Sequence, residues 1–151
     1  VGPIDENTPC NPRNPYGIAK NFLRQAMFDF ASVTPELNLQ WLRFYYITGD
    51  DRFSNSIFTK ILKAEDEGQE FFPLNSGEML YDFIDIEELS AQIEERILSK
   101  EKGIFNCCSG KPKSLRTAVE EFITKHNLKI KPKYNVFPAR TYDSMATWGK
   151  R

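Results

Sequence analysis

The sequence has little net charge and no long apolar run. Its 20 lysines and arginines nearly balance 21 acidic residues, which leaves a formal net charge of −1. Proteins that bind nucleic acid through phosphate contacts carry a basic excess, so we expect no nucleic-acid partner. No segment approaches the ~20 consecutive apolar residues that cross a bilayer, and the first residues lack the basic and apolar regions of a signal peptide. We therefore expect no membrane partner.

Cysteine and histidine are scarce. Cys10, Cys107 and Cys108 form an odd set in a chain of 151 residues, a length that buries a core without disulfide bonds. This favours reduced thiols and a cytoplasmic location. Adjacent cysteines lack the spacing of zinc ligands, so we expect two small buried side chains rather than a metal or redox site. The single histidine, His126, is expected to be solvated at a helix end.

The sequence also lacks a glycine-rich turn. Its eight glycines, at positions 2, 17, 49, 68, 77, 103, 110 and 149, include no pair spaced as in the strand-to-helix turn that approaches a dinucleotide pyrophosphate. We therefore do not expect these residues alone to hold a dinucleotide.

Apolar residues at intervals of three and four predict four helices. The first runs from residue 16 to about 31, after a loop rich in proline and asparagine over residues 1–15. The others begin after capping residues, which are Ser54 or Asn55 for the second helix, Asp85 for the third and Ser114 for the fourth.

Strands are predicted between these helices. The nearly continuous apolar run over residues 39–47 is typical of a parallel strand covered on both faces. Residues 70–74 and 79–84 predict two short strands around a turn, and residues 103–108 predict another strand. With 40% hydrophobic and 27% charged residues, the composition fits a single globular α/β unit.

Tyr16 and Lys20 are four residues apart at the start of the first predicted helix, so both side chains lie on one face. An ammonium beside a phenol stabilises the phenolate, which suits a proton-transfer group. A Tyr-x-x-x-Lys match arises by chance in roughly one chain in three of this composition. From spacing alone, a partly buried tyrosine beside a lysine with a packed stem is as good an interpretation.

Further segments surround this pair in a recognisable order. They are Glu6-Asn7-Thr8-Pro9, Asn14-Pro15-Tyr16, Leu42-Arg43-Phe44-Tyr45-Tyr46-Ile47-Thr48-Gly49, Asp82-Phe83-Ile84-Asp85-Ile86, Phe105-Asn106, Ser109-Gly110-Lys111-Pro112, Ser114-Leu115-Arg116, and Arg140 with Asp143. Over nearly its whole length the chain resembles the extended short-chain dehydrogenase/reductases, the NAD-dependent epimerase/dehydratase family that acts on nucleotide sugars.

The resemblance implies an α/β fold: the C-terminal part of a Rossmann-like parallel sheet plus the small α+β substrate-binding lobe. Residues 1–50 would supply the last helix and strand of the dinucleotide-binding domain. Residues 51–151 would form mostly the substrate-binding lobe, with strands returning to the sheet. NAD, or NADP, would be bound largely by an N-terminal half that the chain lacks.

The resemblance also implies roles for individual residues. Tyr16 would be the catalytic acid/base. Lys20 would stabilise its phenolate and, with Tyr16, contact the cofactor at the nicotinamide ribose. Tyr45 would lie near the nicotinamide. Three residues, Tyr46, Arg140 and Asp143, would place the nucleotide diphosphate and the sugar.

Two positions depart from the family pattern. Tyr46 stands where an asparagine usually contacts the substrate, and Tyr81 stands where an arginine often grips the diphosphate. Aromatic filling of a core strand is an even alternative for Tyr45 and Tyr46. Of the basic residues, Arg43 is expected to form a structural ion pair and Lys111 to be a solvated turn residue.

For Arg140 an exposed loop position is an alternative to phosphate binding. Asp143 is equally suited to capping the next turn.

The implied function is that of an NAD-dependent nucleotide-sugar epimerase/dehydratase, an oxidoreductase or isomerase that works by hydride transfer. A nucleotide-sugar 4-keto reductase of the same family, and a non-catalytic NAD-sensing or protein-binding member, are the alternatives. The fragment alone is expected to be inactive. A homodimer through the helix of Tyr16, and a setting in polysaccharide biosynthesis, follow from the same resemblance.

Overall fold

The structure is a computed structural model that describes residues 2–49, 53–138 and 145–151. Its strands pair mostly in parallel. Its elements, in chain order, are β1 (Gly2–Ile4), α1 (Pro15–Ser32), β2 (Gln40–Phe44), β3 (Tyr46–Thr48), α2 (Ile57–Asp66), β4 (Phe71–Pro73), β5 (Leu80–Asp85), α3 (Ile86–Ser99), β6 (Gly103–Cys107), β7 (Pro112–Ser114), α4 (Leu115–Lys125), β8 (Lys131–Lys133) and β9 (Ala146–Gly149).

Strand β5 pairs with three other strands, β3, β7 and β9, in the largest sheet. The largest sheet has the order β1-β9-β5-β3, all paired in parallel, with β7 antiparallel to β5. Two further parallel pairs are β2 with β6 and β4 with β8. The α/β fold class with a parallel sheet is therefore confirmed.

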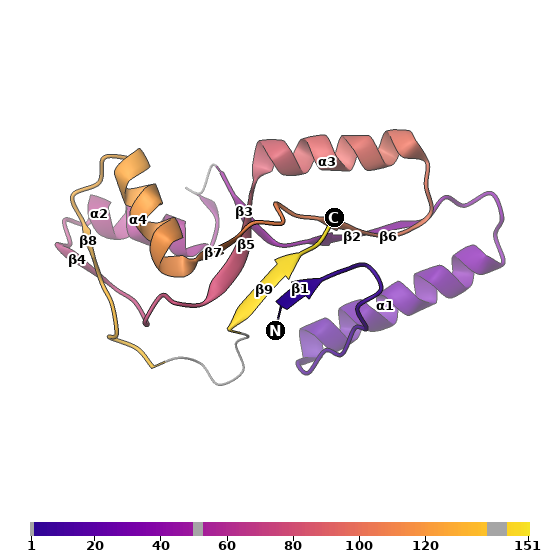
Figure 1. Ribbon diagram of the computed structural model, residues 1–151, viewed down its shortest axis with the longest axis horizontal. Coiled ribbons are helices and arrows are strands. Elements are labelled where there is room, and N and C mark those ends of the chain that lie inside the picture. The colour runs from indigo at the N-terminus through magenta and orange to yellow at the C-terminus, as the bar shows by residue number, and fades with distance from the viewer. Residues whose placement is uncertain (1, 50–52, 139–144) are drawn as a thin grey trace.

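Helices α1 and α3 lie on opposite sides of the β2–β6 pair (Figure 1). On the α3 side, Ile93 and Leu89 pack with Leu42 of β2, Ile84 of β5 and Cys107 of β6. The side facing α1 carries alternate residues of β2, because successive strand residues point to opposite faces. The residues of β2 are only partly buried, and Phe44 at its end is 49% exposed, so the predicted covering of this strand on both faces is confirmed only in part.

A second cluster of elements, α2, α4, β4 and β8, has its own core and lies at the other end of the molecule (Figure 1). Its buried residues are Phe58, Ile61, Ala64, Leu74, Ala118, Val119 and Ile130. The Glu65 carboxylate joins α2 to the segment before β8, because it accepts hydrogen bonds from the backbone N–H groups of Lys129 and Ile130.

The predicted helix starts are largely correct. Asp85 and Ser114 cap α3 and α4 by accepting hydrogen bonds from the N–H groups of Glu87 and Thr117. The prediction of Ser54 or Asn55 as the cap of α2 is wrong, since Ser56 accepts from Thr59. Ser54, two residues earlier, instead accepts a hydrogen bond from the backbone N–H of Ser56.

Two strand predictions need correction because their partners are distant in sequence. The predicted loop over residues 1–15 contains β1, which pairs with β9 at the far end of the chain. The predicted strand over residues 39–47 is divided at Tyr45 into β2, paired with β6, and β3, paired with β5. The two short strands around the turn at 75–77, β4 and β5, form but do not pair with each other.

The apolar stripe of α1 faces outward. None of its residues is buried, and Phe22 is 72% exposed and Phe30 57% exposed.

In the part of the chain that the structure describes, no helix is both long and apolar enough to cross a membrane.

Both adjacent cysteines are buried, as predicted, and all three thiols are free. Burial raises the pKa of the Cys108 thiol to about 11 and also raises that of Cys107. His126 is exposed at the C-cap of α4, with its ring beside that of Phe122.

The Asp82 carboxylate joins three segments at the centre of the sheet. The residue is 0% exposed. One carboxylate oxygen accepts from the N–H and the hydroxyl of Ser109, at 2.8 and 2.7 Å. The other accepts from the N–H groups of Gly110 and Gly149, both at 3.0 Å. Asp82 thereby holds the turn after β6 and the last residue of β9 against β5.

We predict that Asp82→Asn destabilises the protein by about 2–4 kcal/mol. The amide replaces one carboxylate oxygen by an NH2 group, which is a donor and cannot accept hydrogen bonds from the buried N–H and hydroxyl donors around it. Asp85→Asn, three residues along, is the control: asparagine is also a good N-cap, so this change should cost under about 0.5 kcal/mol. Denaturant unfolding monitored by circular dichroism measures both. Equal stability of the Asp82 variant and the parent would contradict the role of the carboxylate.

Candidate functional site

Tyr16 and Lys20 lie on one face of α1, as their spacing predicts. The Nζ atom of Lys20 is 5.9 Å from the centroid of the Tyr16 ring. The helix begins immediately before them, since Asn14 caps it by accepting a hydrogen bond from the N–H of Gly17 at 2.7 Å. Tyr16 is 73% exposed, so its phenol is open to a reactant.

Gly17 sets how closely the first turn of α1 approaches the loop before it. A Cβ atom there would lie 2.9 Å from Cβ of Pro12 and 3.3 Å from the side-chain oxygen of Asn14. Only a residue without a side chain allows this approach. Gly17 thus fixes the position of Tyr16 relative to the loop.

A pocket of about 450 Å³ lies between α1 and β2. Three cations line it, Lys20, Arg24 and Arg43, together with Tyr45 and Cys10. Arg24 is turned toward its own helix, where it donates to the side-chain oxygen of Asn21. The lining of the pocket is therefore positive, and Lys20 contributes to it from α1.

Arg43 has a structural role, but not through the predicted ion pair. Its guanidinium donates to the carbonyl oxygen of Asp5 at 3.1 Å and to Sγ of Cys10 at 3.3 Å. None of the carboxylates in the described residues lies within ion-pair distance of it. The side chain of Asp5, whose carbonyl oxygen Arg43 contacts, instead accepts a hydrogen bond from the hydroxyl of Thr8.

Tyr45 and Tyr46 face different pockets. Tyr45 lines the smaller one and donates from its hydroxyl toward Asn106 at 3.5 Å; burial raises its pKa to about 12. Tyr45 therefore stays protonated near neutral pH. Tyr46 lines a larger pocket on the other side of the strand. The chain thus brings Lys20 and Tyr45 to the smaller pocket and Tyr46 to the larger one, whereas Tyr16 lines neither.

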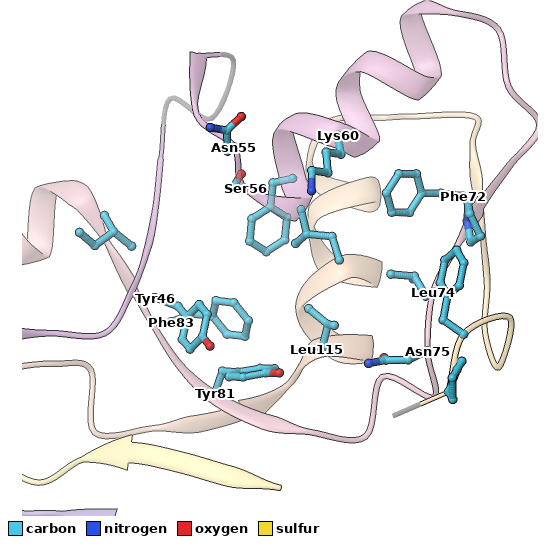
Figure 2. Close-up of a pocket in the computed structure, with 16 residues that line it drawn as sticks. Tyr46, Asn55, Ser56, Lys60, Phe72, Leu74, Asn75, Tyr81, Phe83 and Leu115 are labelled. Atoms are coloured by element: carbon cyan, nitrogen blue, oxygen red, sulfur yellow. The ribbon is translucent and has the colours of Figure 1, made fainter. Parts of the chain in front are cut away.

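The larger pocket, about 800 Å³, lies between β3, β5, α2 and the segment around β4 (Figure 2). Its volume is within the usual range for small-molecule sites. The lining combines aromatic, aliphatic and amide side chains: Tyr46, Ile47, Asn55, Ser56, Ile57, Phe58, Lys60, Phe72, Pro73, Leu74, Asn75, Tyr81, Phe83, Leu115, Phe137 and Pro138.

The two tyrosines that depart from the family pattern meet in this pocket. The rings of Tyr46 and Tyr81 are in edge contact, with centroids 4.5 Å apart, and the ring of Phe83 is 5.8 and 5.9 Å from them. Figure 2 shows the three rings gathered on the β5 side of the pocket. This side is aromatic and carries no formal charge.

Several lining residues were not singled out from the sequence. Asn55, considered from the sequence only as a helix cap, precedes α2, and Lys60 lies in the first turn of that helix. Phe72 and Asn75 belong to the segment around β4 (Figure 2). Lys60 itself is indistinguishable by spacing from a solvated helix lysine.

The remaining residues weighed in the sequence are Arg140, Asp143 and Lys111. Arg140 and Asp143 lie outside the described residues. Lys111 is exposed in the turn after β6, as predicted, with its N–H donating to the hydroxyl of Ser109. Among the described residues no group of three or more acidic, cysteine or histidine side chains could hold a metal ion.

Comparison with known proteins finds a family and a partial overlap with its members. Residues 1–108 match the model of the NAD dependent epimerase/dehydratase family. The chain is 89% identical over 151 residues to a dTDP-6-deoxy-L-talose 4-dehydrogenase (NAD(+)) of Aggregatibacter actinomycetemcomitans, covering 100% of this chain and 56% of that protein.

Solved structures agree on the fold. A Bacillus anthracis dTDP-glucose 4,6-dehydratase in complex with NAD matches with a TM-score of 0.81 at 19% identity, covering 99% of this chain and 47% of that one. A Methanobrevibacter ruminantium UDP-N-acetylglucosamine 4-epimerase in complex with UDP-N-acetylmuramic acid matches with a TM-score of 0.81 at 23% identity, covering 98% and 48%. The chain spans about half the length of these proteins.

We predict that Gly17→Ala destabilises the protein by about 1–3 kcal/mol, because the new methyl overlaps Pro12 and forces α1 away from the loop. In a Pro12→Gly background the same change should cost at least about 0.5 kcal/mol less, since the clashing atom is gone. A double-mutant cycle of unfolding free energies measures this coupling. Additive effects of the two changes would rule out the close contact.

Proposed function

The chain belongs to the NAD dependent epimerase/dehydratase family, and from this premise we propose that it is the C-terminal part of an NAD-dependent nucleotide-sugar enzyme. The proposed reaction is the oxidation of a dTDP-linked 6-deoxyhexose at the C4 hydroxyl, or its reverse. In the forward direction C4 loses a hydride to NAD, the hydroxyl loses a proton, and a 4-keto sugar and NADH form. Identity of 89% to a protein described as such a dehydrogenase supports this choice over epimerisation or dehydration.

One observation carries the proposal: an exposed Tyr16 phenol with the Lys20 ammonium on the same helix face. In the oxidation, Tyr16 accepts the proton of the sugar hydroxyl, and in the reduction it returns it to the keto oxygen. Lys20 stabilises the phenolate by its positive charge. A binding-only member of the family would need neither residue.

The residues of the smaller pocket fit a nicotinamide nucleotide. When bound, NAD supplies the hydride acceptor. The Lys20 ammonium is a donor suited to ribose hydroxyls, and the Tyr45 phenol, protonated because burial raises its pKa to about 12, is a neutral donor on the same side. We propose Tyr16, Lys20 and Tyr45 as the contribution of this chain to the cofactor site, the remainder coming from an N-terminal half.

Tyr46, with Arg140 and Asp143, is proposed to contact the substrate. Position supports this for Tyr46, which lines the larger pocket one residue after Tyr45 lines the smaller one. Sugar and nicotinamide would then meet at the end of the strand that carries both tyrosines. This agrees with the rule that ligands of parallel sheets collect at the carboxyl ends of strands.

The proposed domain division is residues 1–50 for the dinucleotide-binding part and 51–151 for mostly the substrate lobe. The separate core of α2, α4, β4 and β8 supports a lobe of its own. The pairing of β6 with β2 supports a return of the later chain to the sheet. A cytoplasmic location is also proposed, on the strength of the three free thiols. A role in polysaccharide biosynthesis stays a prediction.

We propose a homodimer through α1. Its exposed apolar residues support this: Ile18, Phe22, Leu23 and Phe30 are between 48% and 72% exposed. Such a stripe is costly to leave in water, and a second copy of the helix covers it with the same surface.

Two substitutions test the catalytic assignment in the full-length protein. Tyr16→Phe should lower kcat by roughly a hundredfold to ten-thousandfold while NAD still binds, since only the proton-transfer group is lost. Lys20→Met should lower kcat and also weaken NAD binding. NADH absorbance with a dTDP-6-deoxyhexose measures turnover. The control is Lys63→Met, an exposed lysine paired with Glu67 on α2. Full turnover of the Tyr16 variant would refute the proposal.

The dimer is tested separately. Phe22→Glu in the full-length protein should shift sedimentation from dimer to monomer, because a carboxylate in an apolar helix interface is left desolvated and unpaired. Phe71→Glu on β4, also exposed, should leave the dimer intact. A monomeric parent protein, or a Phe22 variant that stays dimeric, would contradict the proposed interface.

A further inference from the structure

A nucleotide diphosphate brings negative charge into its pocket, and charge-assisted hydrogen bonds are the strong way to bind it. The larger pocket has tyrosine at position 81, where the family often has a guanidinium. Among its described lining residues one is charged, Lys60 of α2. None of the described lining residues is acidic, so nothing in that lining competes for the ammonium.

Lys60 differs from its neighbours on the same helix. It is exposed, and no carboxylate of the described residues lies within ion-pair distance of it. Lys63, almost one turn later, instead pairs with Glu67 at 4.0 Å. Figure 2 shows the Lys60 side chain directed into the pocket between the start of α2 and Phe72. An ammonium on a long flexible stem can meet a phosphate without fixed bidentate geometry.

The opposite side of the pocket has an aromatic surface without charged side chains, which suits an uncharged group. Tyr46, Tyr81 and Phe83 form the aromatic cluster there, and the Tyr81 hydroxyl is directed to Sδ of Met79 at 3.5 Å. Lys60 and this cluster lie at opposite ends of the pocket (Figure 2). The charge of the pocket is therefore concentrated at the α2 end and its aromatic surface at the β5 end.

We propose that Lys60 supplies a cationic contact to the substrate diphosphate where position 81 has no arginine, in addition to any contact from Arg140, while the Tyr46–Tyr81 pair contacts an uncharged part of the substrate. This rests on the proposed function, which requires a nucleotide-linked sugar in the pocket. It adds a residue and a location that the family pattern does not supply, since the cation comes from α2 and not from β5.

Calorimetric titration of the full-length protein, loaded with NAD, tests this with two probes, dTDP and thymidine. The parent should bind dTDP more tightly than thymidine. Lys60→Met should weaken dTDP binding roughly tenfold or more and leave thymidine affinity within about twofold, because only the diphosphate loses a partner. The dTDP affinity of the variant should also depend less on salt concentration.

Matched variants separate charge from packing. Lys60→Arg keeps the charge and should bind dTDP within a few-fold of the parent. Lys63→Met removes a lysine of the same helix that does not line the pocket and should change neither affinity. Retained thymidine affinity in Lys60→Met shows that the pocket is intact.

The outcomes distinguish this proposal from the proposed function. A parent that binds dTDP more tightly than thymidine, together with an unchanged Lys60→Met variant, overturns the role of Lys60 and leaves the enzyme assignment standing. A parent that binds neither probe overturns both. Equal weakening of dTDP and thymidine in Lys60→Met also overturns the diphosphate role, because it places the loss in packing.

Discussion

The buried carboxylate of Asp82 is the constraint on which the arrangement of the main sheet and the larger pocket depends. It gathers N–H and hydroxyl donors from the turn after β6 and from the end of β9 onto the middle of β5. Because β5 is held there, Tyr81 and Phe83 on either side of Asp82 face the larger pocket. The same strand pairs with β3, which carries Tyr46, and leads directly into the capping residue of α3.

The two candidate pockets lie on opposite sides of the segment that contains β2 and β3. Tyr45 lines the smaller pocket, which has a positive lining that includes Lys20 of α1. Tyr46 lines the larger, aromatic pocket, whose volume of about 800 Å³ is large enough for a small-molecule ligand. Under the proposed function, a dinucleotide on one side and a nucleotide sugar on the other would meet at this strand. The outward apolar stripe and exposed Tyr16 of α1 fit a surface that further protein covers or adjoins.

Local signals in the sequence predicted the local features well. The helix of Tyr16 and Lys20, their shared face and the caps Asp85 and Ser114 depend on residues within one or two turns. Features that depend on distant partners could not be predicted. Strand β1 exists only through β9, and Arg43 finds a carbonyl and a thiol rather than a carboxylate. The sequence around Lys60 does not distinguish it from a solvated helix lysine, because its place in the pocket lining depends on where α2 packs.

Calorimetric titration of the full-length protein and of this chain, with NAD and a panel of UDP-, dTDP-, GDP- and CDP-sugars, tests the central claim most directly. A cofactor site split between two halves predicts that the full-length protein binds NAD and a dTDP-6-deoxyhexose, and that the 151-residue chain binds NAD far more weakly or not at all. A folded full-length protein that binds no NAD and none of these sugars would contradict the proposal that Tyr16 and Lys20 serve a nucleotide-sugar reaction.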